Sequence, residues 1–165
     1  MLMDVDGVLT DGRLFHFVDT KGRLVELKGV DTQDGIALTW LARNGIRTGV
    51  ISGRRSAGFA ARARALRMSY VVQGADEKLA PFERILKEAR LRPDEAAFIG
   101  DDLPDIPVMR RAGWAIAVAN ARPEVKRAAH TVTKRRGGGG AVREAVELLL
   151  KSRGLWEGLV ESYRS

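Results

Sequence analysis

The sequence predicts an α/β fold of three layers, in which a doubly wound parallel sheet lies between two layers of helices. Two observations predict this fold class. Short apolar runs alternate along the chain with longer segments of helical spacing, and acidic residues follow two of the apolar runs. Strands that alternate with helices are typical of βαβ units, whose parallel sheets are covered on both faces and bind ligands where the strands end.

The expected elements follow each other in a regular order. Strand-like runs occupy residues 2–5, 46–51, 70–72, 96–99, 115–118 and 131–133. Helical patterns occupy residues 32–43, 56–66, 79–89, 104–111, 123–128 and 141–151. The last of these places apolar side chains at the spacing of one buried helix face, at Val142, Val146, Leu149 and Leu150.

One segment interrupts the alternation. A β-hairpin is predicted over residues 14–27, where two strand-like runs flank the turn-like sequence Asp19-Thr20-Lys21-Gly22. Because an isolated two-stranded hairpin is only marginally stable in water, we expect it to pack on the body of the protein or on another subunit. The side chains expected on its apolar face are Phe15, Phe17 and Leu24.

Size and composition suit a single domain spanning residues 1–165. Residues 137–165 are expected to form a C-terminal helix and tail, with a flexible glycine loop at 137–140. The absence of cysteine excludes disulfides and a cysteine-ligated metal, and it fits a reducing compartment, so we predict a cytoplasmic protein. No apolar run approaches the roughly 20 residues of a membrane helix, and we expect neither a signal peptide nor a membrane partner.

The formal net charge of +7 points to an acidic partner, which could be nucleic acid, an acidic surface or a small anionic substrate. Basic stretches lie at residues 54–67 and 122–136. Aromatic residues make up only 6% of the chain and are not interleaved with these stretches, so no stacking platform for nucleic acid is visible. We therefore expect a small anionic substrate and no nucleic-acid partner.

Aspartates at two predicted strand ends carry the strongest chemical signal. Asp4 and Asp6 follow the first apolar run, and Asp101, Asp102 and Asp105 follow the run at 96–99. Aspartate is a poor strand residue, so such a cluster calls for a reason. One reason is a hard cation with oxygen ligands, which we expect to be Mg²⁺, that holds a phosphate against one carboxylate. The alternative is that the aspartates only begin loops and cap helices.

Other residues at strand and helix ends suit a phosphoryl group. Ser52 and Arg54 end the second buried run, and Lys78 precedes a predicted helix. A hydroxyl, a helix N-terminus and an ammonium are the groups that stabilise phosphoryl oxygens. Taken alone, Ser52 is more often a helix cap and Lys78 more often a solvated surface residue.

In chain order, these residues resemble the four motifs of the haloacid dehalogenase superfamily, at residues 4–12, 52–54, 78 and 100–102. Further matches at 33–35, 52–56, 73–74 and 140–144 resemble the capless phosphatases that act on 3-deoxy-D-manno-octulosonate 8-phosphate (Kdo 8-phosphate). The resemblance covers nearly the whole chain. It implies a Rossmann-like sheet without a cap domain and a Mg²⁺-dependent phosphomonoester hydrolase that works through an aspartyl-phosphate.

The resemblance also implies a role for each acidic residue. Asp4 would be the nucleophile and a metal ligand. Asp6 would protonate the leaving alkoxide, deprotonate the attacking water and offer its backbone carbonyl to Mg²⁺. Asp101 would bind Mg²⁺ directly, while Asp102 and Asp105 would support the ligands or act through water.

The remaining motif residues would bind the substrate. Ser52 and Lys78 would hold the phosphoryl oxygens. The residues that match contacts to the sugar acid are Asp31, Thr32, Gln33, Asp34, Gly35, Arg54 and Arg62. In such phosphatases the hairpins assemble a homotetramer, and a neighbouring subunit completes each site, so the same is expected here, with the C-terminal tail as a cover over a neighbouring site.

Departures from the family pattern keep alternatives open. Ala37 stands where these phosphatases commonly have a second glycine, and only Met1-Leu2-Met3 precedes Asp4, so the natural start is expected upstream. Three alternatives stay open: a same-fold phosphatase for another sugar phosphate such as a nonulosonate 9-phosphate, a non-catalytic binding or assembly domain, and a receiver-like domain. The position of the Asp-x-Asp pair at the start of the chain argues against the last.

Overall fold

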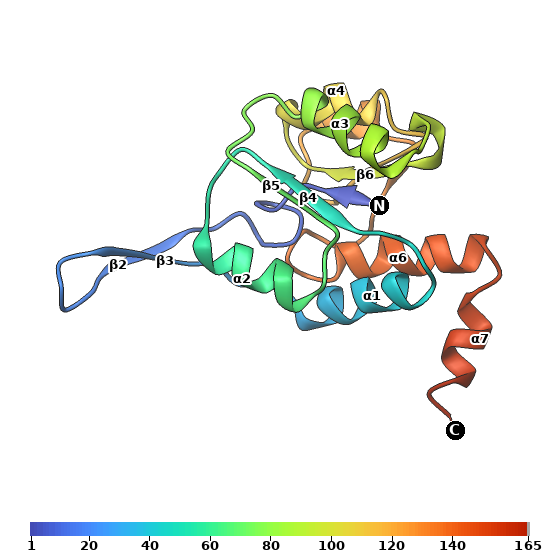
Figure 1. Ribbon diagram of the computed structural model, residues 1–165, viewed down its shortest axis with the longest axis horizontal. Helices are drawn as coiled ribbons and strands as arrows, with labels where there is room; N and C mark the ends of the chain where they lie inside the picture. Colours follow the sequence, from blue (N-terminus) through green and yellow to red (C-terminus); the bar gives the residue numbers. More distant parts are fainter. Residues whose placement is uncertain (165) are drawn as a thin grey trace.

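A parallel sheet forms the centre of the computed structural model, which describes residues 1–164 (Figure 1). Over these residues its six strands lie in the order β5-β4-β1-β6-β7-β8, and every pairing is parallel. The strands are β1 (Leu2–Met3), β4 (Gly49–Ser52), β5 (Tyr70–Gln73), β6 (Ala97–Gly100), β7 (Trp114–Ala117) and β8 (Thr131–Val132). The predicted doubly wound sheet is confirmed.

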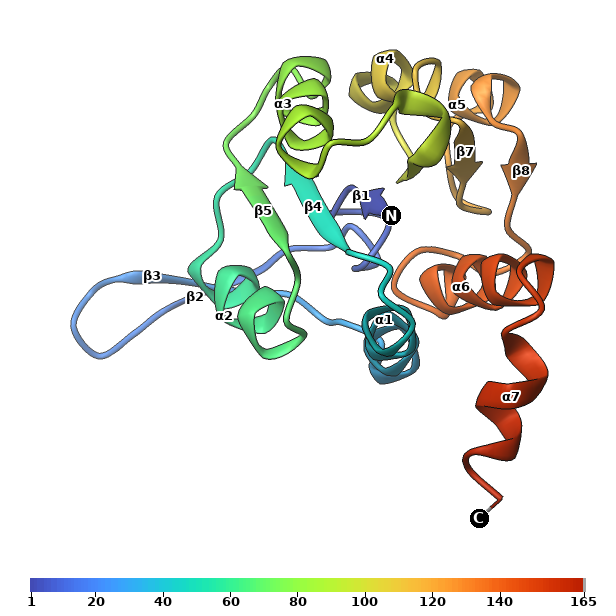
Figure 2. The ribbon, with the colours of Figure 1, turned by 45° about the vertical axis from the view of Figure 1, so that its right-hand side comes forward.

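Helices cover both faces of this sheet, as Figures 1 and 2 show. One layer contains α3 (Leu79–Ala89), α4 (Ile106–Met109) and α5 (Pro123–Ala128), and the other contains α1 (Thr32–Arg43), α2 (Ala57–Ala65) and α6 (Ala141–Ser152). The single helix expected over 104–111 is divided into a 3₁₀ turn, η2 (Leu103–Asp105), and α4. A further 3₁₀ turn, η1 (Pro93–Glu95), precedes β6.

The central strands are apolar because both of their faces are covered. All four residues of β4 and of β6 are buried. Between the sheet and α3, the rings of Phe82 and Phe98 meet edge to face with centroids 6.4 Å apart, and both side chains are fully buried. This core holds the strand ends in fixed positions.

The order of the strands determines where a ligand can bind. The chain runs outward from β1 to β4 and β5, and then returns past β1 to build β6, β7 and β8 on the other side. β1 and β6 are therefore neighbours whose connections lead in opposite directions. In open α/β sheets, ligands bind at the carboxyl ends of strands at such a switch point.

The predicted hairpin is present as β2 (Phe15–Val18) and β3 (Leu24–Leu27), and it projects from the body of the molecule (Figures 1 and 2). Its antiparallel register pairs Phe15 with Leu27 and Phe17 with Val25, which places these four on one face. Leu24 pairs with Val18, so its assignment to the face of Phe15 and Phe17 is wrong. Among the described residues no cap domain accompanies the hairpin.

The glycine segment at 137–140 is packed, and the expectation of a flexible loop is wrong. The Gly138 N–H donates to the Val8 carbonyl at 2.9 Å, and the Gly137 N–H donates to Asn120 Oδ1 at 2.7 Å. A Cβ at Gly137 would overlap the Gly7 carbonyl oxygen. Glycine is needed here because two backbone segments touch.

The C-terminal segment contains one more helix, α7 (Trp156–Glu161), which follows α6 and points away from the sheet (Figure 2). Its aromatic residues pack on the chain's own α1. The rings of Trp40 and Trp156 lie 5.8 Å apart, and Trp40 Nε1–H donates to the Tyr163 hydroxyl at 2.9 Å. Within residues 1–164, no helix is long and apolar enough to cross a membrane.

Candidate active site

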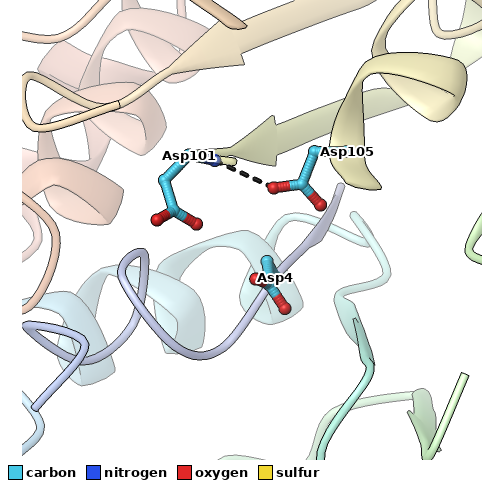
Figure 3. Close-up of side chains that lie close together, drawn as sticks. All are labelled: Asp4, Asp101 and Asp105. Carbon is cyan, nitrogen blue, oxygen red and sulfur yellow. Dashed lines mark hydrogen bonds between the residues drawn. The ribbon is translucent and has the colours of Figure 1, made fainter. Parts of the chain in front are cut away.

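Three aspartates meet at the switch point of the sheet (Figure 3). Asp4 directly follows β1, and its N–H donates to the Ile99 carbonyl of β6 at 3.0 Å. Asp101 directly follows β6, and Asp105 lies in η2. One carboxylate oxygen from each lies within 4.8 Å of the other two. The two acidic segments that the sequence separates by almost 100 residues therefore form one cluster.

Lys78 neutralises part of this cluster. It lies at the N-terminal end of α3 with a side chain only 5% exposed, and its Nζ contacts Asp4 Oδ1 at 2.9 Å and Asp105 Oδ1 at 2.7 Å. Burial alone would lower the pKa of Lys78, but the two carboxylates outweigh burial and raise it. The lysine is thus a fixed positive charge.

Asp105 holds the other groups in place. Its carboxylate is fully buried, and Oδ2 accepts the N–H of Asp101 at 2.9 Å and the N–H of Asp102 at 3.3 Å. Asp102 is exposed and accepts the N–H of Leu103 at the start of η2. Asp105 therefore connects the turn after β6 to Lys78.

The cluster carries more negative charge than Lys78 can balance. Burial raises the pKa of Asp4 to about 6, although Lys78 opposes that shift. Burial and the charges of Asp4 and Asp105 raise the pKa of Asp101 to about 7. Asp101 Oδ1 is buried and has no hydrogen-bond partner among the described residues. Carboxylates that lie close together and carry uncompensated negative charge are suitable ligands for a hard divalent cation. The donor set therefore fits Mg²⁺.

A cleft of about 390 Å³ opens beside the cluster. The sequence-predicted residues that line it are Asp4, Asp6, Ser52, Arg54, Lys78, Asp101, Asp102 and Asp105. Ser52 is the buried last residue of β4, and its Oγ accepts the N–H of Arg54 at 3.3 Å. The cleft thus joins a hydroxyl, a guanidinium and an ammonium to the acidic cluster.

Asp6 has a partner that the sequence reasoning missed. Lys28, just after β3, places its Nζ 2.8 and 2.9 Å from the two oxygens of the Asp6 carboxylate. Arg54 Nε lies 3.8 Å from the same carboxylate. The alternation of Glu26 and Lys28 on one side of a predicted strand was the available signal, but it could not show which residue they face.

Most of the other predicted substrate residues lie outside this cleft. Asp31 caps α1, where its Oδ1 accepts the N–H of Gln33 at 2.6 Å, and both residues line a separate hollow against α6. Thr32 is exposed at the same helix end. The Arg62 guanidinium lies over Gly35, and Arg62 lines a smaller hollow under the hairpin.

Asp34 lies beneath the start of α6, and its predicted contact with a substrate stays a prediction. It is 1% exposed, and its Oδ1 accepts the N–H of Arg143 in the first turn of α6 at 2.7 Å. A carboxylate at this place satisfies a free backbone donor of the helix. It is also absent from the residues that line the cleft.

Known proteins are similar to this chain along most of its length. Residues 67–145 match the family model of the haloacid dehalogenase-like hydrolases. A curated relative from Yersinia pestis, named 3-deoxy-D-manno-octulosonate 8-phosphate phosphatase KdsC, is 37% identical over 158 residues, which are 96% of this chain and 82% of the relative. At this identity and coverage, the similarity extends over the whole fold.

Solved structures agree. The Moraxella catarrhalis 3-deoxy-D-manno-octulosonate 8-phosphate phosphatase, in complex with magnesium ion, phosphate ion and KDO, is 36% identical with a TM-score of 0.93, over 98% of this chain and 91% of that one. The cobalt-bound phosphatase YrbI from Haemophilus influenzae is 34% identical with a TM-score of 0.87, over 94% and 88%. The chain therefore belongs to the haloacid dehalogenase-like hydrolases, in the phosphatase family that includes these Kdo 8-phosphate phosphatases.

Proposed function

We propose that the protein hydrolyses the phosphomonoester of a phosphorylated sugar acid, with Kdo 8-phosphate as the first candidate, and that it needs Mg²⁺ and forms an aspartyl-phosphate. The observation that carries the proposal is the contact of Asp4 with Lys78 beside the buried, unpaired oxygen of Asp101. A nucleophile, a fixed cation and a free metal ligand are what phosphoryl transfer to a carboxylate requires.

The metal would be held by the Asp4 and Asp101 carboxylates and by the backbone carbonyl of Asp6, with Asp102 and Asp105 supporting the ligands. Bound there, Mg²⁺ would neutralise the charge that keeps a phosphate dianion away from the carboxylates and would polarise its oxygens. Lys78 already reduces that repulsion, because its Nζ lies 2.9 Å from Asp4. Ser52 Oγ, at the end of β4, would donate to a phosphoryl oxygen.

In the first step, an oxygen of the Asp4 carboxylate attacks phosphorus, and the bond from phosphorus to the sugar oxygen breaks. Asp6 gives its proton to that oxygen, so the sugar leaves as an alcohol. Asp4 suits the attack because β1 and the Ile99 carbonyl fix its backbone beside the cleft.

In the second step, water attacks the phosphorus of the aspartyl-phosphate. Asp6, now ionised, takes a proton from that water, and the bond between phosphorus and the Asp4 oxygen breaks. Phosphate leaves, and both aspartates return to their starting state.

The substrate class is supported by the relatives' names and by Arg54, which lies 52% exposed in the cleft and can pair with an anionic group of the sugar acid. Arg62, Asp31, Thr32, Gln33 and Gly35 lie outside the cleft of one chain, so a contact from them to the sugar would need a site extended by the hollows beside α1 and α2. A nonulosonate 9-phosphate stays the alternative substrate, since Ala37 in α1 stands where these phosphatases commonly have a second glycine.

We also propose that residues 1–165 act as one domain within a homotetramer assembled through the hairpins. The exposed apolar face of Phe15, Phe17 and Leu27 supports this assembly. The cytoplasmic location and the cover formed by the tail stay predictions.

A phosphatase screen tests the proposal. Purified protein with Mg²⁺ should release phosphate from Kdo 8-phosphate faster than from other sugar phosphates, and chelation by EDTA should abolish turnover until Mg²⁺ is restored. Asp4→Asn should lose at least about 10³-fold in kcat while it keeps the wild-type circular dichroism spectrum. Hydrolysis that persists in Asp4→Asn, or in EDTA, would contradict the nucleophile or the metal assignment respectively.

A further inference from the structure

We propose that Gln73 is a positioning residue for the phosphoryl group, which acts by holding the segment that carries Ser52 and Arg54. The inference deepens the proposed function and rests on the phosphate site that it assigns, because Ser52 and Arg54 both line the cleft. Gln73 is the last residue of β5, is partly buried, and is not among the described residues that line the cleft. An effect of Gln73 on a bound phosphate must therefore pass through the residues that it contacts.

The side-chain amide of Gln73 makes two hydrogen bonds to the backbone of one residue. Its Oε1 accepts the Ser56 N–H at 3.0 Å, and its Nε2–H donates to the Ser56 carbonyl at 3.2 Å. Ser56 caps α2, where its Oγ accepts the Phe59 N–H at 3.3 Å. The N–H of a capping residue has no acceptor in the first turn of its own helix backbone, so Gln73 supplies one from the neighbouring strand. A donor and an acceptor in one planar amide fix the place of Ser56 relative to β5.

The other end of the segment is held as well. Ser52 and Gln73 are partners in the parallel register of β4 and β5, and the Ser52 carbonyl accepts the Ala75 N–H at 3.1 Å. Only residues 53–55 lie between Ser52 and Ser56. A short link whose two ends are held has few conformations, so the contact of Gln73 with Ser56 helps to determine the course of the whole link.

The course of this link decides which of two adjacent arginines faces the cleft. Arg54 lines the cleft, whereas Arg55 lies against Gly74, where an added Cβ would be 2.5 Å from Arg55 Nε. Ser52 Oγ accepts the Arg54 N–H at 3.3 Å, so its own proton can be donated to a phosphoryl oxygen. Without the contact made by Gln73, the link can turn, and both groups lose their fixed directions. A displacement of about 1 Å at such groups can cost about 10²-fold in rate.

Binding of inorganic phosphate separates a positioning role from a purely structural one. Gln73→Met keeps the length of the side chain, adds no charge and removes both hydrogen bonds. It should raise the Kd for inorganic phosphate, measured by calorimetry in the presence of Mg²⁺, by about 5- to 50-fold, and KM for Kdo 8-phosphate by a similar factor. Mg²⁺ should raise the thermal midpoint of Gln73→Met as much as that of the wild type, because both hydrogen bonds of the Gln73 amide go to Ser56 and not to an aspartate.

Thr131→Val is the matched control, since it also removes one side-chain hydrogen bond between neighbouring strands. It loses the bond from Trp114 Nε1–H to Thr131 Oγ1 at 3.0 Å, so it should lower the thermal midpoint while the phosphate Kd stays within about 2-fold of wild type. Gln73→Asn, whose amide is one methylene too short to reach, gives the same comparison if Gln73→Met does not fold.

A folded Gln73 variant that binds phosphate as tightly as the wild type, at whatever thermal midpoint, would overturn the positioning role. A wild-type protein that binds phosphate but hydrolyses no phosphate ester would contradict the proposed function, while the inference would still be decided by the two Kd values. A wild-type protein that binds no phosphate in Mg²⁺ would overturn both.

Discussion

The carboxylate of Asp34 lies beneath the first turn of α6, where its Oδ1 accepts the Arg143 N–H and its Oδ2 has no hydrogen-bond partner among the described residues. Burial raises the pKa of Asp34 to about 6, although the Arg143 N–H opposes that shift. A carboxyl whose pKa is higher in the folded than in the unfolded state binds more protons when folded. Its ionisation therefore destabilises the fold as the pH rises.

This sign gives a prediction at the scale of one residue. The free energy of unfolding of the wild type should fall relative to that of Asp34→Asn as the pH rises from about 4 to 7, by at most about 3 kcal/mol. Urea denaturation of both proteins at several pH values, in EDTA, measures the difference. Because Asp4 and Asp101 are common to both proteins, their titration cancels in the comparison. Parallel pH profiles would contradict the assignment.

The residue scale also shows what a sequence can reveal about a site. Asp4 and Asp101 were predictable because aspartate seldom occurs where a buried strand ends. The partner of Asp6 was not, since Lys28 lies 22 positions away along the chain. The contact of Asp34 with α6 was not predictable either, because its partner, Arg143, lies 109 positions away along the chain. Local pattern identifies the chemical group, and tertiary structure decides what it touches.

At the scale of elements, α7 and the residues that follow it pack on α1. Trp156 packs edge to face on Trp40, and the Tyr163 hydroxyl accepts hydrogen bonds from Trp40 Nε1 and Arg43 Nη1 at 2.9 and 3.1 Å. Lys151 Nζ lies 4.9 Å from the centre of the Trp156 ring. These contacts within one chain favour a tail that stabilises the fold.

Loss of the contacts between the C-terminal segment and α1 should therefore lower the stability of the fold. Trp156→Ala should lower the free energy of unfolding by about 1–3 kcal/mol, because it removes half-buried aromatic surface. Arg164→Ala, which loses only an exposed ion pair with Glu161, should change it by less than about 0.5 kcal/mol. Urea denaturation checks both. A Trp156→Ala protein with wild-type stability but altered KM would instead support the tail as a cover over a site.

Periodicity predicted the elements better than it predicted the connections between them. Helix α1 begins and ends as expected, since its apolar spacing reflects one buried face. The four glycines at 137–140 have the composition of a flexible loop. In the structure, however, Gly137 and Gly138 pack against the backbone of Gly7 and Val8, which leaves no room for a side chain. Composition alone cannot distinguish a glycine that makes a loop flexible from a glycine that allows two backbone segments to approach closely.

At the scale of the whole molecule, three large apolar side chains on one face of the hairpin are exposed in the described residues. Phe15 is 59% exposed, Phe17 48% and Leu27 54%, and they lie on the same face. Side chains of this size on a projecting ribbon are typical of an interface with another chain. The net charge of +7 makes copies of the chain repel each other. The driving force for their association would therefore have to come from the burial of apolar surface.

The prediction for the assembly concerns its mass. Light scattering should give the wild-type protein a molar mass of about four times 18.1 kDa. The double substitution Phe15→Ser and Phe17→Ser should lower this mass toward 18.1 kDa, because the apolar area shared between chains is lost. Lys21→Ser at the turn of the same hairpin serves as the control and should keep the wild-type mass. A double variant with unchanged mass would place the interface elsewhere.

The contact between the glycine segment and the loop after β1 has a consequence for folding kinetics. The loop after β1 is synthesised before Gly137, Gly138 and Asn120, which contact it only after more than 100 further residues have been added. β1 likewise needs β4 and β6 on its two sides. Contacts of such long sequence separation form late and slowly. We therefore expect catalytic competence to be among the last properties that the folding chain acquires.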